Sequence, residues 1–410
     1  MVKEERCLMK DPPAVIGVGR TRFGEHYELD PEDLIDEAGL MALDSAGIER
    51  KDLDACFISD YLLQVTNKIG LEEGFISQLL EMNVPIERMR SFSSALLNAC
   101  NAIEAGKYEV VLVGGMEKMT DRWSKIRDNL MLLVDHWSYY AGGTPETNHE
   151  LLLREYIKEY NIHGDDQQKL MTTLAHISVK NHRNAVWNEY AHFRREIDVK
   201  RVFAARAEER KTLGLYDFAP ISDGATALIL ASPRRAKEYT DNMVYVLASS
   251  LATDFISYPS RSHRAGFIAS RIAMEKALKM ANISLNDIKL LEVYDQSTVL
   301  EMISLEDLGF VEKGTAWIKL YENFEDFKGF YDADGKQVYV NTNGGLKADG
   351  NPLGATGGAQ VFEVVKQIKG EAGQRQIKPD GDLLYGCVQE IEGFGTKVYV
   401  HILGREKSGQ

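Results

Sequence analysis

Cysteine is scarce in this chain of 410 residues, which contains only Cys7, Cys56, Cys100 and Cys387. None of them stands in a Cys-x-x-Cys spacing, so the sequence predicts neither a disulfide framework nor a zinc site, and we expect no metal centre. Long apolar runs are missing as well, because the longest, such as Val110–Gly115 and Ala225–Ala231, have only the length of strands. A membrane span needs about 20 apolar residues, so we expect none.

Basic residues are in deficit, since 48 Lys and Arg face 62 Asp and Glu for a net charge of −14. This balance argues against a general nucleic-acid binder, which needs a basic surface. The N-terminal segment MVKEERCLMKDPP lacks the apolar stretch of a secretory signal, so we expect a cytoplasmic protein. The hydrophobic content of 44% and charged content of 27% are typical of a globular chain, whose length predicts two or three domains.

An internal duplication organises the chain. The segment Ala42–Asp60 matches Ala277–Asp295 without a gap. Each copy has the pattern of a helix end, a turn and a strand that finishes at an Asp. Small-residue helices are then expected at Ser94–Ala105 and Gly357–Lys369, each followed by an apolar strand. Helices that alternate with buried strands predict an α/β fold built as two homologous halves.

The first half carries an insertion that is charged and helical in pattern. We predict an N-terminal half from residues 1–121 and 211–240, an insertion lobe over the site from residues 122–210, and a C-terminal half from residues 241–410. An insertion of this length usually has a function of its own, such as covering a binding site.

Several segments resemble the thiolase superfamily, and within it the sterol-carrier-type and archaeal branch. The segments are AVIGVGRTRFGE, AGKYEVVLVGGMEKMTD, VKNHRNAVWNEYAHFRREI, PISDGATALILAS, EVYDQSTVLEMISLEDLGF and GGLKADGNPLGATGGAQVFEVVKQIKGEAGQRQ. The resemblance spans residues 14–404 in the family's order. It implies the thiolase fold, with a five-layered α-β-α-β-α core, an assembly of at least two subunits, and coenzyme A in the form of acyl-CoA as the ligand.

The resemblance also shows where the family's nucleophilic Cys should stand, eight residues after a proline at the start of a buried helix. Counting from Pro85 puts Ser93 there, whereas counting backwards from Gly106 without a gap puts Met89 there. We prefer Ser93 because the upstream match is local and ungapped. Neither residue can supply a thiolate, the reactive form of Cys.

The family's other catalytic positions have changed too. Asn351 replaces the His of the GHP motif, and the branch's HDCF motif is YDQS here, so Tyr294 replaces His and Gln296 replaces Cys. Glu390 stands where other thiolases carry a base Cys. The candidate catalytic residues are therefore Ser93, Tyr294, Asn351 and Glu390. The loop after Glu390 contributes the candidate oxyanion glycines Gly393 and Gly395.

Each candidate also has a simpler interpretation. Ser93 suits a helix N-cap, and Tyr294 suits a buried tyrosine with a backbone partner. Asn351 suits a left-handed turn, and Glu390, beside Glu392, suits a solvated loop. Cys100 lies about two helical turns beyond Ser93, where it is either a displaced nucleophile or a core residue. The lobe residues that are candidates for binding the CoA phosphates are His182, Arg183, Arg194 and Arg195.

The sequence supports two functional hypotheses. In the first, the chain is a lipid-metabolic acyl-CoA enzyme that makes or breaks a C–C bond next to a thioester, by acyl transfer, retro-Claisen or retro-aldol chemistry. Its Tyr-Asp in place of His-Asp resembles thiolase-like steroid side-chain aldolases, which implies an OB-fold/zinc-ribbon partner subunit. In the second, the chain is a catalytically silent subunit that pairs with an active thiolase paralogue. Under either hypothesis the chain can also form a dimer with a second copy of itself.

Overall fold

The computed structural model describes residues 11–323, 329–331, 335, 337–379 and 383–405. The first half of the chain contributes strands β1 (Ala14–Arg20), β2 (Ala55–Ser59), β3 (Ile86–Met89), β4 (Val110–Glu117) and β5 (Gly224–Ala231). The second half contributes β6 (Val244–Thr253), β7 (Ile288–Glu292), β8 (Gly329–Tyr331), β9 (Gln337–Val340), β10 (Tyr385–Glu392) and β11 (Lys397–Gly404). Cys7 lies outside the described residues.

The strands follow the order β3-β2-β4-β5-β1-β6-β11-β10-β7-β9-β8. The two halves meet at β1 and β6, which pair antiparallel through Ala14–Tyr245 and Val15–Val244. Outward from this junction each half repeats one pattern, with an antiparallel neighbour, a second antiparallel strand, and then two parallel pairings. The second half adds β8, which pairs antiparallel with β9. The predicted α/β fold with two homologous halves is therefore confirmed.

The duplicated segment has the same local structure in both copies. Helices α1 (Pro31–Ala46) and α11 (Ile268–Ala281) end in left-handed residues, Gly47 at φ 68° and Asn282 at φ 53°. A 3₁₀ turn follows each helix at matching positions of the two copies, at residues 50–52 and at residues 285–287. Gly and Asn tolerate this backbone conformation, which explains why the two helices stop at equivalent positions.

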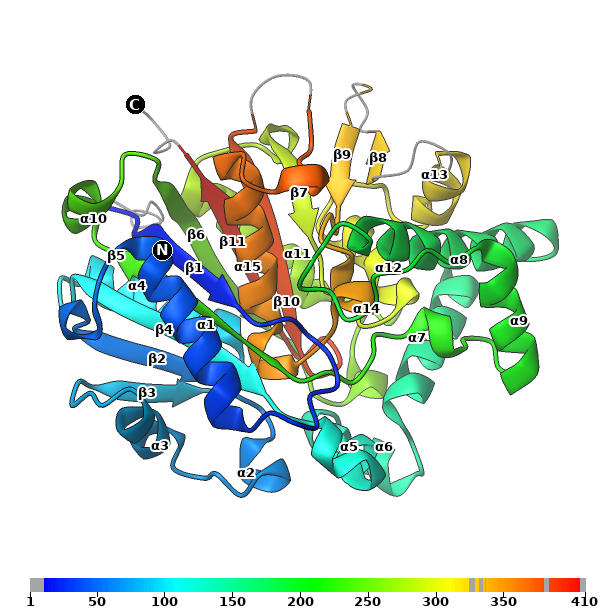
Figure 1. Ribbon diagram of the computed structural model, residues 1–410. Helices are drawn as coiled ribbons and strands as arrows, with labels where there is room; N and C mark the ends of the chain where they lie inside the picture. Colours follow the sequence, from blue (N-terminus) through cyan, green and yellow to red (C-terminus); the bar gives the residue numbers. More distant parts are fainter. Residues whose placement is uncertain (1–10, 324–328, 332–334, 336, 380–382, 406–410) are drawn as a thin grey trace.

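Helices and sheet halves form five layers. The outer helices of the first half are α1, α2 (Leu63–Thr66), α3 (Glu72–Leu79) and α10 (Pro233–Tyr239). Those of the second half are α11, α12 (Thr298–Asp307) and α13 (Ala316–Glu322). The central layer contains α4 (Phe92–Glu104) and α15 (Leu353–Lys369), and α15 packs against strands of both halves (Figure 1). Gly354 and Gly358 allow α15 to lie close to the strands. A Cβ atom at Gly354 would overlap the Met116 carbonyl, and one at Gly358 would overlap the Thr226 side chain.

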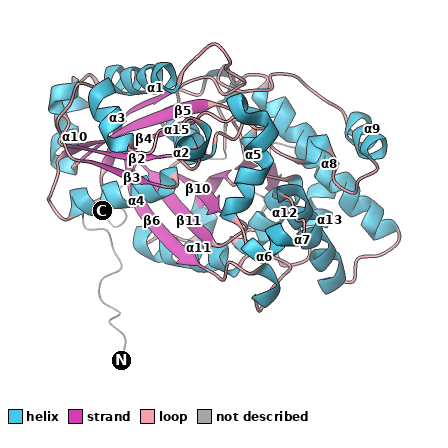
Figure 2. Cartoon of the chain, turned by 90° about the horizontal axis from the view of Figure 1, so that it is seen from below, coloured by secondary structure: helices cyan, strands magenta, loops and turns pink. Residues whose placement is uncertain are grey.

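The segment between β4 and β5 is helical, as expected for an insertion. It contains α5 (Trp123–Leu130), α6 (His136–Tyr140), α7 (Pro145–Glu159), α8 (Asp165–Ala185) and α9 (Val199–Glu209). These helices gather on one side of the sheets, as Figures 1 and 2 show. Helix α8 packs on α12, α13 and α14 (Gly345–Asp349) of the second half. The limits of the lobe and halves stay predictions, and residues 1–10 and 406–410 of the halves lie outside the described residues.

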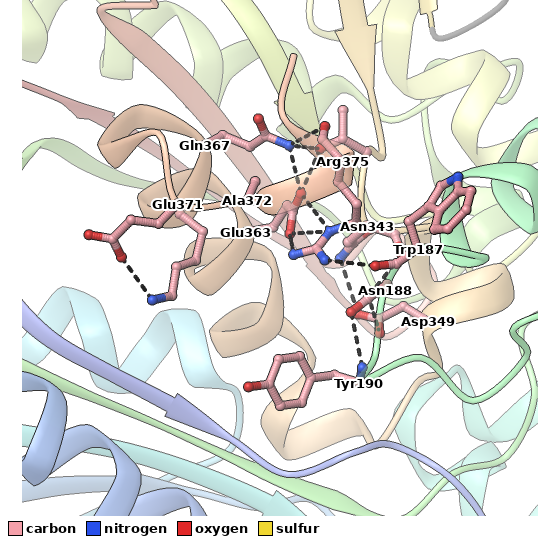
Figure 3. A network of polar contacts seen from close by, with 12 residues as sticks. Trp187, Asn188, Tyr190, Asn343, Asp349, Glu363, Gln367, Glu371, Ala372 and Arg375 are labelled. Atoms are coloured by element: carbon pink, nitrogen blue, oxygen red, sulfur yellow. Dashed lines mark hydrogen bonds and ion pairs between the residues drawn. The ribbon is translucent and has the colours of Figure 1, made fainter.

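A partly buried polar network connects the segment after α8 to the second half (Figure 3). The Arg375 guanidinium donates to Glu363 on α15, with Nη2 and Oε2 2.8 Å apart, and to the Trp187 carbonyl at 3.2 Å. The Asn188 amide donates to Asp349 Oδ1 at 3.0 Å. Bidentate and charge-assisted hydrogen bonds of this kind are strong and directional, so they hold the segment after α8 in place.

Candidate active site

Two carboxylates of β10 face the N-terminus of α4. Ser91 is the N-cap, and its Oγ accepts a hydrogen bond from the Ser94 amide at 3.2 Å and donates to Glu392 Oε1 at 2.6 Å. The Ser93 amide donates to Glu390 Oε2 at 2.7 Å. The expectation that Ser93 is the N-cap is therefore wrong, because Ser91 caps the helix and Ser93 lies in its first turn. The positive end of the helix stabilises the nearby carboxylates.

Glu390 is fully buried, at 0% exposure, so its interpretation as a solvated loop residue is wrong. The strand β10 continues through Glu392 and takes both side chains into the interior. Burial raises the Glu390 pKa to about 7, although hydrogen bonds from Ser93 oppose the change. Its Oε2 is held by Ser93, while Oε1 has no hydrogen-bond partner among the described residues. Gly357 on α15 leaves room for this carboxylate, because a Cβ atom there would overlap Oε2.

Tyr294 and Asn351 lie together. Tyr294 follows β7 and is 2% exposed. Burial raises its pKa well above 10, and the Glu390 carboxylate adds to the effect, whereas a hydrogen bond from the Asn351 side chain opposes it. The Thr356 hydroxyl donates to Asn351 Oδ1 at 2.9 Å, which leaves the Asn351 amide nitrogen to donate to the phenol. These contacts connect Ser93, Glu390, Tyr294 and Asn351 in one cluster.

The backbone of Asn351 does not have the left-handed geometry that its turn interpretation requires. Asn351 pairs with Ile221 in a parallel bridge, and the positive φ angles just before it belong to Gly344, Gly345 and Gly350. The glycines absorb the tight turn, and the Asn side chain is left to make polar contacts.

A cavity opens beside this cluster, in two adjoining parts. Tyr294, Tyr61 and Gly393 line the first part, and Asn351 lines the second. Residues that line both parts are Leu130, Pro145, His149, Gln296 and Leu353. Leu130, Pro145 and His149 belong to the lobe, so its helices α5 and α7 form one wall of the cavity.

The two glycines of the loop after β10 differ in position. Gly393 lines the cavity at φ 67°, and a Cβ atom there would overlap the Leu133 carbonyl. Gly395, at φ 73°, packs on Phe267 and does not line the cavity. Of these two glycines, Gly393 is the one placed where its backbone can approach a ligand.

His149 and Tyr61 are among the cavity residues that sequence reasoning missed. His149 carries no motif, and only the folding of α7 over the site brings it there. Tyr61 had a signal, because it follows Asp60 as Gln296 follows Asp295 in the duplication, and both line the cavity. Asp295, the Asp that ends the second copy, makes structural contacts, because its carboxylate accepts hydrogen bonds from the Leu346 amide at 2.6 Å and from Asn181 Nδ2 at 2.7 Å.

The candidate phosphate-binding residues lie elsewhere in the lobe. His182 is buried, its Nδ1 contacts the Arg195 carbonyl at 3.1 Å, and burial lowers its pKa to about 3. A neutral, enclosed imidazole cannot pair with a phosphate as a cation. Arg183, Arg194 and Arg195 are exposed, and none of them lines the cavity with Tyr294. Pairing with the CoA phosphates therefore stays a prediction for the three arginines.

The described cysteines are unsuited to nucleophilic catalysis. Cys100 is fully buried in α4, and burial raises the pKa of its thiol. Burial also raises the pKa of Cys56 and of Cys387 to about 12. The thiolate is the reactive form, so these three side chains are inert core residues.

Two further observations concern the described residues only. No helix among them is both long enough and apolar enough to cross a bilayer. No three of their His, Cys, Asp or Glu side chains are grouped so that they could hold a metal ion.

Comparisons with known proteins agree with this architecture. Residues 13–234 match the family model "Thiolase, N-terminal domain", and residues 255–405 match "Thiolase C-terminal domain-like". The chain is 36% identical to an acetyl-CoA acetyltransferase of Methanothermobacter thermautotrophicus, over 96% of this chain and 99% of the relative. It is 30% identical to sterol carrier protein 2 of Homo sapiens, over 88% of this chain and 67% of the relative.

A solved structure of an "Ltp2-ChsH2(DUF35) aldolase" superposes with a TM-score of 0.78 at 20% identity, covering 98% of this chain and 100% of that chain. At this identity the likeness shows the fold alone. The family models, in contrast, cover both halves of the chain, and the match to the archaeal acetyltransferase extends over almost the whole of both proteins. The protein therefore belongs to the thiolase superfamily, in its sterol-carrier-type branch.

Proposed function

We propose that this protein is an acyl-CoA enzyme that makes or breaks a C–C bond next to a thioester without forming a covalent acyl-enzyme. The names of its relatives support CoA thioesters as substrates. The observation that carries the proposal is the buried Glu390 carboxyl, with one oxygen held at the N-terminus of α4 and the other without a partner among the described residues. A carboxyl with a pKa near neutrality suits general base catalysis.

The two titratable groups have pKa values that assign their roles. Glu390, with a pKa of about 7, is ionised in a useful fraction of molecules at neutral pH and serves as the base. Tyr294 stays protonated because its pKa is raised further, so it serves as the acid. The Asn351 amide supplies a hydrogen bond to the thioester oxygen, where negative charge develops.

In the cleavage direction the substrate is a 3-hydroxyacyl-CoA. Glu390 takes the proton of the 3-hydroxyl group, the bond between C2 and C3 breaks, and C3 leaves as part of an aldehyde or ketone. The electron pair moves onto the thioester as an enolate, which Tyr294 protonates at C2. The phenolate then recovers its proton from Glu390, so both groups return to their starting forms. The reverse sequence forms the bond.

The test is turnover of the purified protein on a panel of 3-hydroxyacyl-CoA and 3-oxoacyl-CoA thioesters. Glu390→Gln and Tyr294→Phe should each lower turnover about 10²-fold or more, because each removes a proton-transferring group. Tyr399→Phe is the matched control, because it removes a buried hydroxyl of the same sheet that donates to Glu392 and not to Glu390. Full activity in both site variants would disprove these roles.

Intact-protein mass spectrometry separates this route from a covalent one. We expect no acyl adduct after incubation with the thioester panel. An adduct on Ser93 or Cys100 would show covalent, thiolase-like chemistry instead.

We also propose that the protein works in the cytoplasm as an oligomer, either with itself or with a small OB-fold/zinc-ribbon subunit. The name of the aldolase that shares its fold includes DUF35, which supports the second arrangement. Size-exclusion chromatography with light scattering, with the chain alone and with a candidate partner, tests both. An unchanged monomer in every mixture would refute them.

The absence of Cys and His at the aligned positions supports a second candidate, a silent subunit of an active thiolase paralogue. That candidate predicts that the pure chain binds CoA thioesters but turns none of them over. It also predicts that Tyr294→Phe leaves the activity of the assembled complex unchanged.

A further inference from the structure

His149 occupies the junction of the two parts of the active-site cavity. It comes from α7 of the lobe, is 3% exposed, and lines both the part with Tyr294 and the part with Asn351. Its ring stacks on Phe394 at a centroid distance of 5.4 Å and lies 5.7 Å from the ring of Phe218. The aromatic neighbours fix the plane of the imidazole, so its nitrogens have a defined direction.

The buried imidazole of His149 has a polar atom without a hydrogen-bond partner. Nδ1 of His149 has no partner among the described residues. Buried polar atoms without partners are rare, because desolvation costs about 1–3 kcal/mol. Burial lowers the pKa of His149 to about 4, although the Glu146 carboxylate on the same helix opposes this. Arg127 of α5 pairs with Glu146, so no full negative charge is left to stabilise an imidazolium.

A second unpartnered atom lines the same part of the cavity. The Tyr61 hydroxyl has no hydrogen-bond partner among the described residues either. Burial raises its pKa well above 10, so the phenol is neutral. The remaining lining of this part is mostly apolar, with Leu130, Leu133 and Val134 from the lobe. Asn148, Gln296 and Tyr294 line this part as well, so its polar groups are all neutral and stand among apolar side chains. Such a lining suits an uncharged oxygen on an otherwise apolar ligand.

We propose that His149 and Tyr61 determine substrate specificity by hydrogen-bonding the oxygen at C3 of the acyl group. The inference rests on the proposed function, in which the Asn351 amide binds the thioester oxygen. With that oxygen in the part lined by Asn351, the acyl group reaches the part lined by Tyr294. His149 thereby supplies the site with an imidazole from the lobe, although the aligned motif position holds Asn351. The class of ligand is a 3-hydroxyacyl or 3-oxoacyl thioester, and a saturated acyl chain leaves both groups unpaired.

The test measures binding rather than turnover. Isothermal titration gives the dissociation constants of 3-hydroxybutyryl-CoA and butyryl-CoA, which differ only in the C3 oxygen. After each titration, the CoA thioester is recovered from the calorimeter cell and analysed by mass spectrometry to show that the protein did not convert it. The wild-type protein should prefer the hydroxylated ligand, and His149→Phe and Tyr61→Phe should each reduce that preference about fivefold, the value of one hydrogen bond. Butyryl-CoA should bind each variant at least as tightly as it binds the wild type, because the variant has one unpaired polar group fewer.

The variants are chosen to keep the fold. His149→Phe retains an aromatic ring between Phe394 and Phe218. Tyr61→Phe removes a single oxygen atom, so this variant tests the proposal if His149→Phe does not fold. His176→Phe is the matched control, because this His lies on α8 of the lobe, stacks on Tyr321 of α13 and does not line the cavity. A folded variant that prefers 3-hydroxybutyryl-CoA over butyryl-CoA as strongly as the wild type would overturn the role proposed for the substituted residue. If the variants lose the preference but the wild-type protein turns over no thioester, the proposed reaction is refuted and the binding site is not.

Discussion

Replacing Glu390 with Gln should make the stability of the protein less sensitive to a rise in pH from about 4.5 to about 7. Glu390 is buried, and its pKa rises from the ordinary 4.5 to about 7. The folded protein therefore holds a proton between these pH values that the unfolded chain releases. The free energy of unfolding falls as the pH rises through this window, because the native state binds more protons. Each pKa unit corresponds to about 1.4 kcal/mol, so ionising Glu390 in the fold costs about 3 kcal/mol.

Glutamine is neutral at every pH and keeps an oxygen that accepts the Ser93 amide. Relative to the wild type, Glu390→Gln should therefore gain about 3 kcal/mol in unfolding free energy on going from about pH 4.5 to about pH 8. Urea denaturation of both proteins at the two pH values measures this double difference, in which the other titrating groups cancel. Glu196→Gln is the control, because Glu196 is exposed in the lobe.

A double difference near zero for Glu390→Gln would refute the reasoning, because it would mean that Glu390 titrates in the fold as it does in the unfolded chain. A residue that titrates normally could not serve as a base tuned by burial. The stability measurement thus tests the electrostatic basis of the proposed mechanism without needing a substrate.

Two further predictions concern the fold and the cysteines. Arg375→Met should lower the unfolding free energy by about 3 kcal/mol in denaturation experiments, because it leaves the buried Glu363 carboxylate without its ion pair. Arg194→Met, on the surface, should change it little, and equal effects would contradict the structural role of the network. Cys100→Ala should keep full turnover and lose only the roughly 1 kcal/mol of a small core cavity, and lost activity in a folded variant would restore Cys100 as a nucleophile.

The sequence alone determined the architecture because local signals recur in it. The match of Ala42–Asp60 with Ala277–Asp295 predicted two homologous halves, and equivalent helix ends at Gly47 and Asn282 confirm them. The charged insertion after β4 was predicted to be helical, and α5 to α9 are helices. Periodicity and turn residues act over a few neighbours, so such features can be read without the fold.

Motif positions also named Ser93, Tyr294, Asn351 and Glu390, but only the tertiary structure decided what each one contacts. The hydrogen bond from the Ser93 amide to Glu390 joins two residues that lie in different halves of the chain, on a helix and on a strand. The sequence interpretation of Glu390 as a solvated loop residue was wrong, because nothing local shows that β10 runs on through Glu392 into the interior.

His149 shows most clearly which site residues cannot be predicted from the sequence. On α7 it has no motif and no counterpart in the other half, and it becomes a cavity residue only because the lobe packs over the junction of the halves. Burial, and with it the pKa of every group in the site, depends on that packing. The sequence therefore determined which elements form and in which order, whereas the packing of the lobe on the two halves decided which side chains meet and how they titrate.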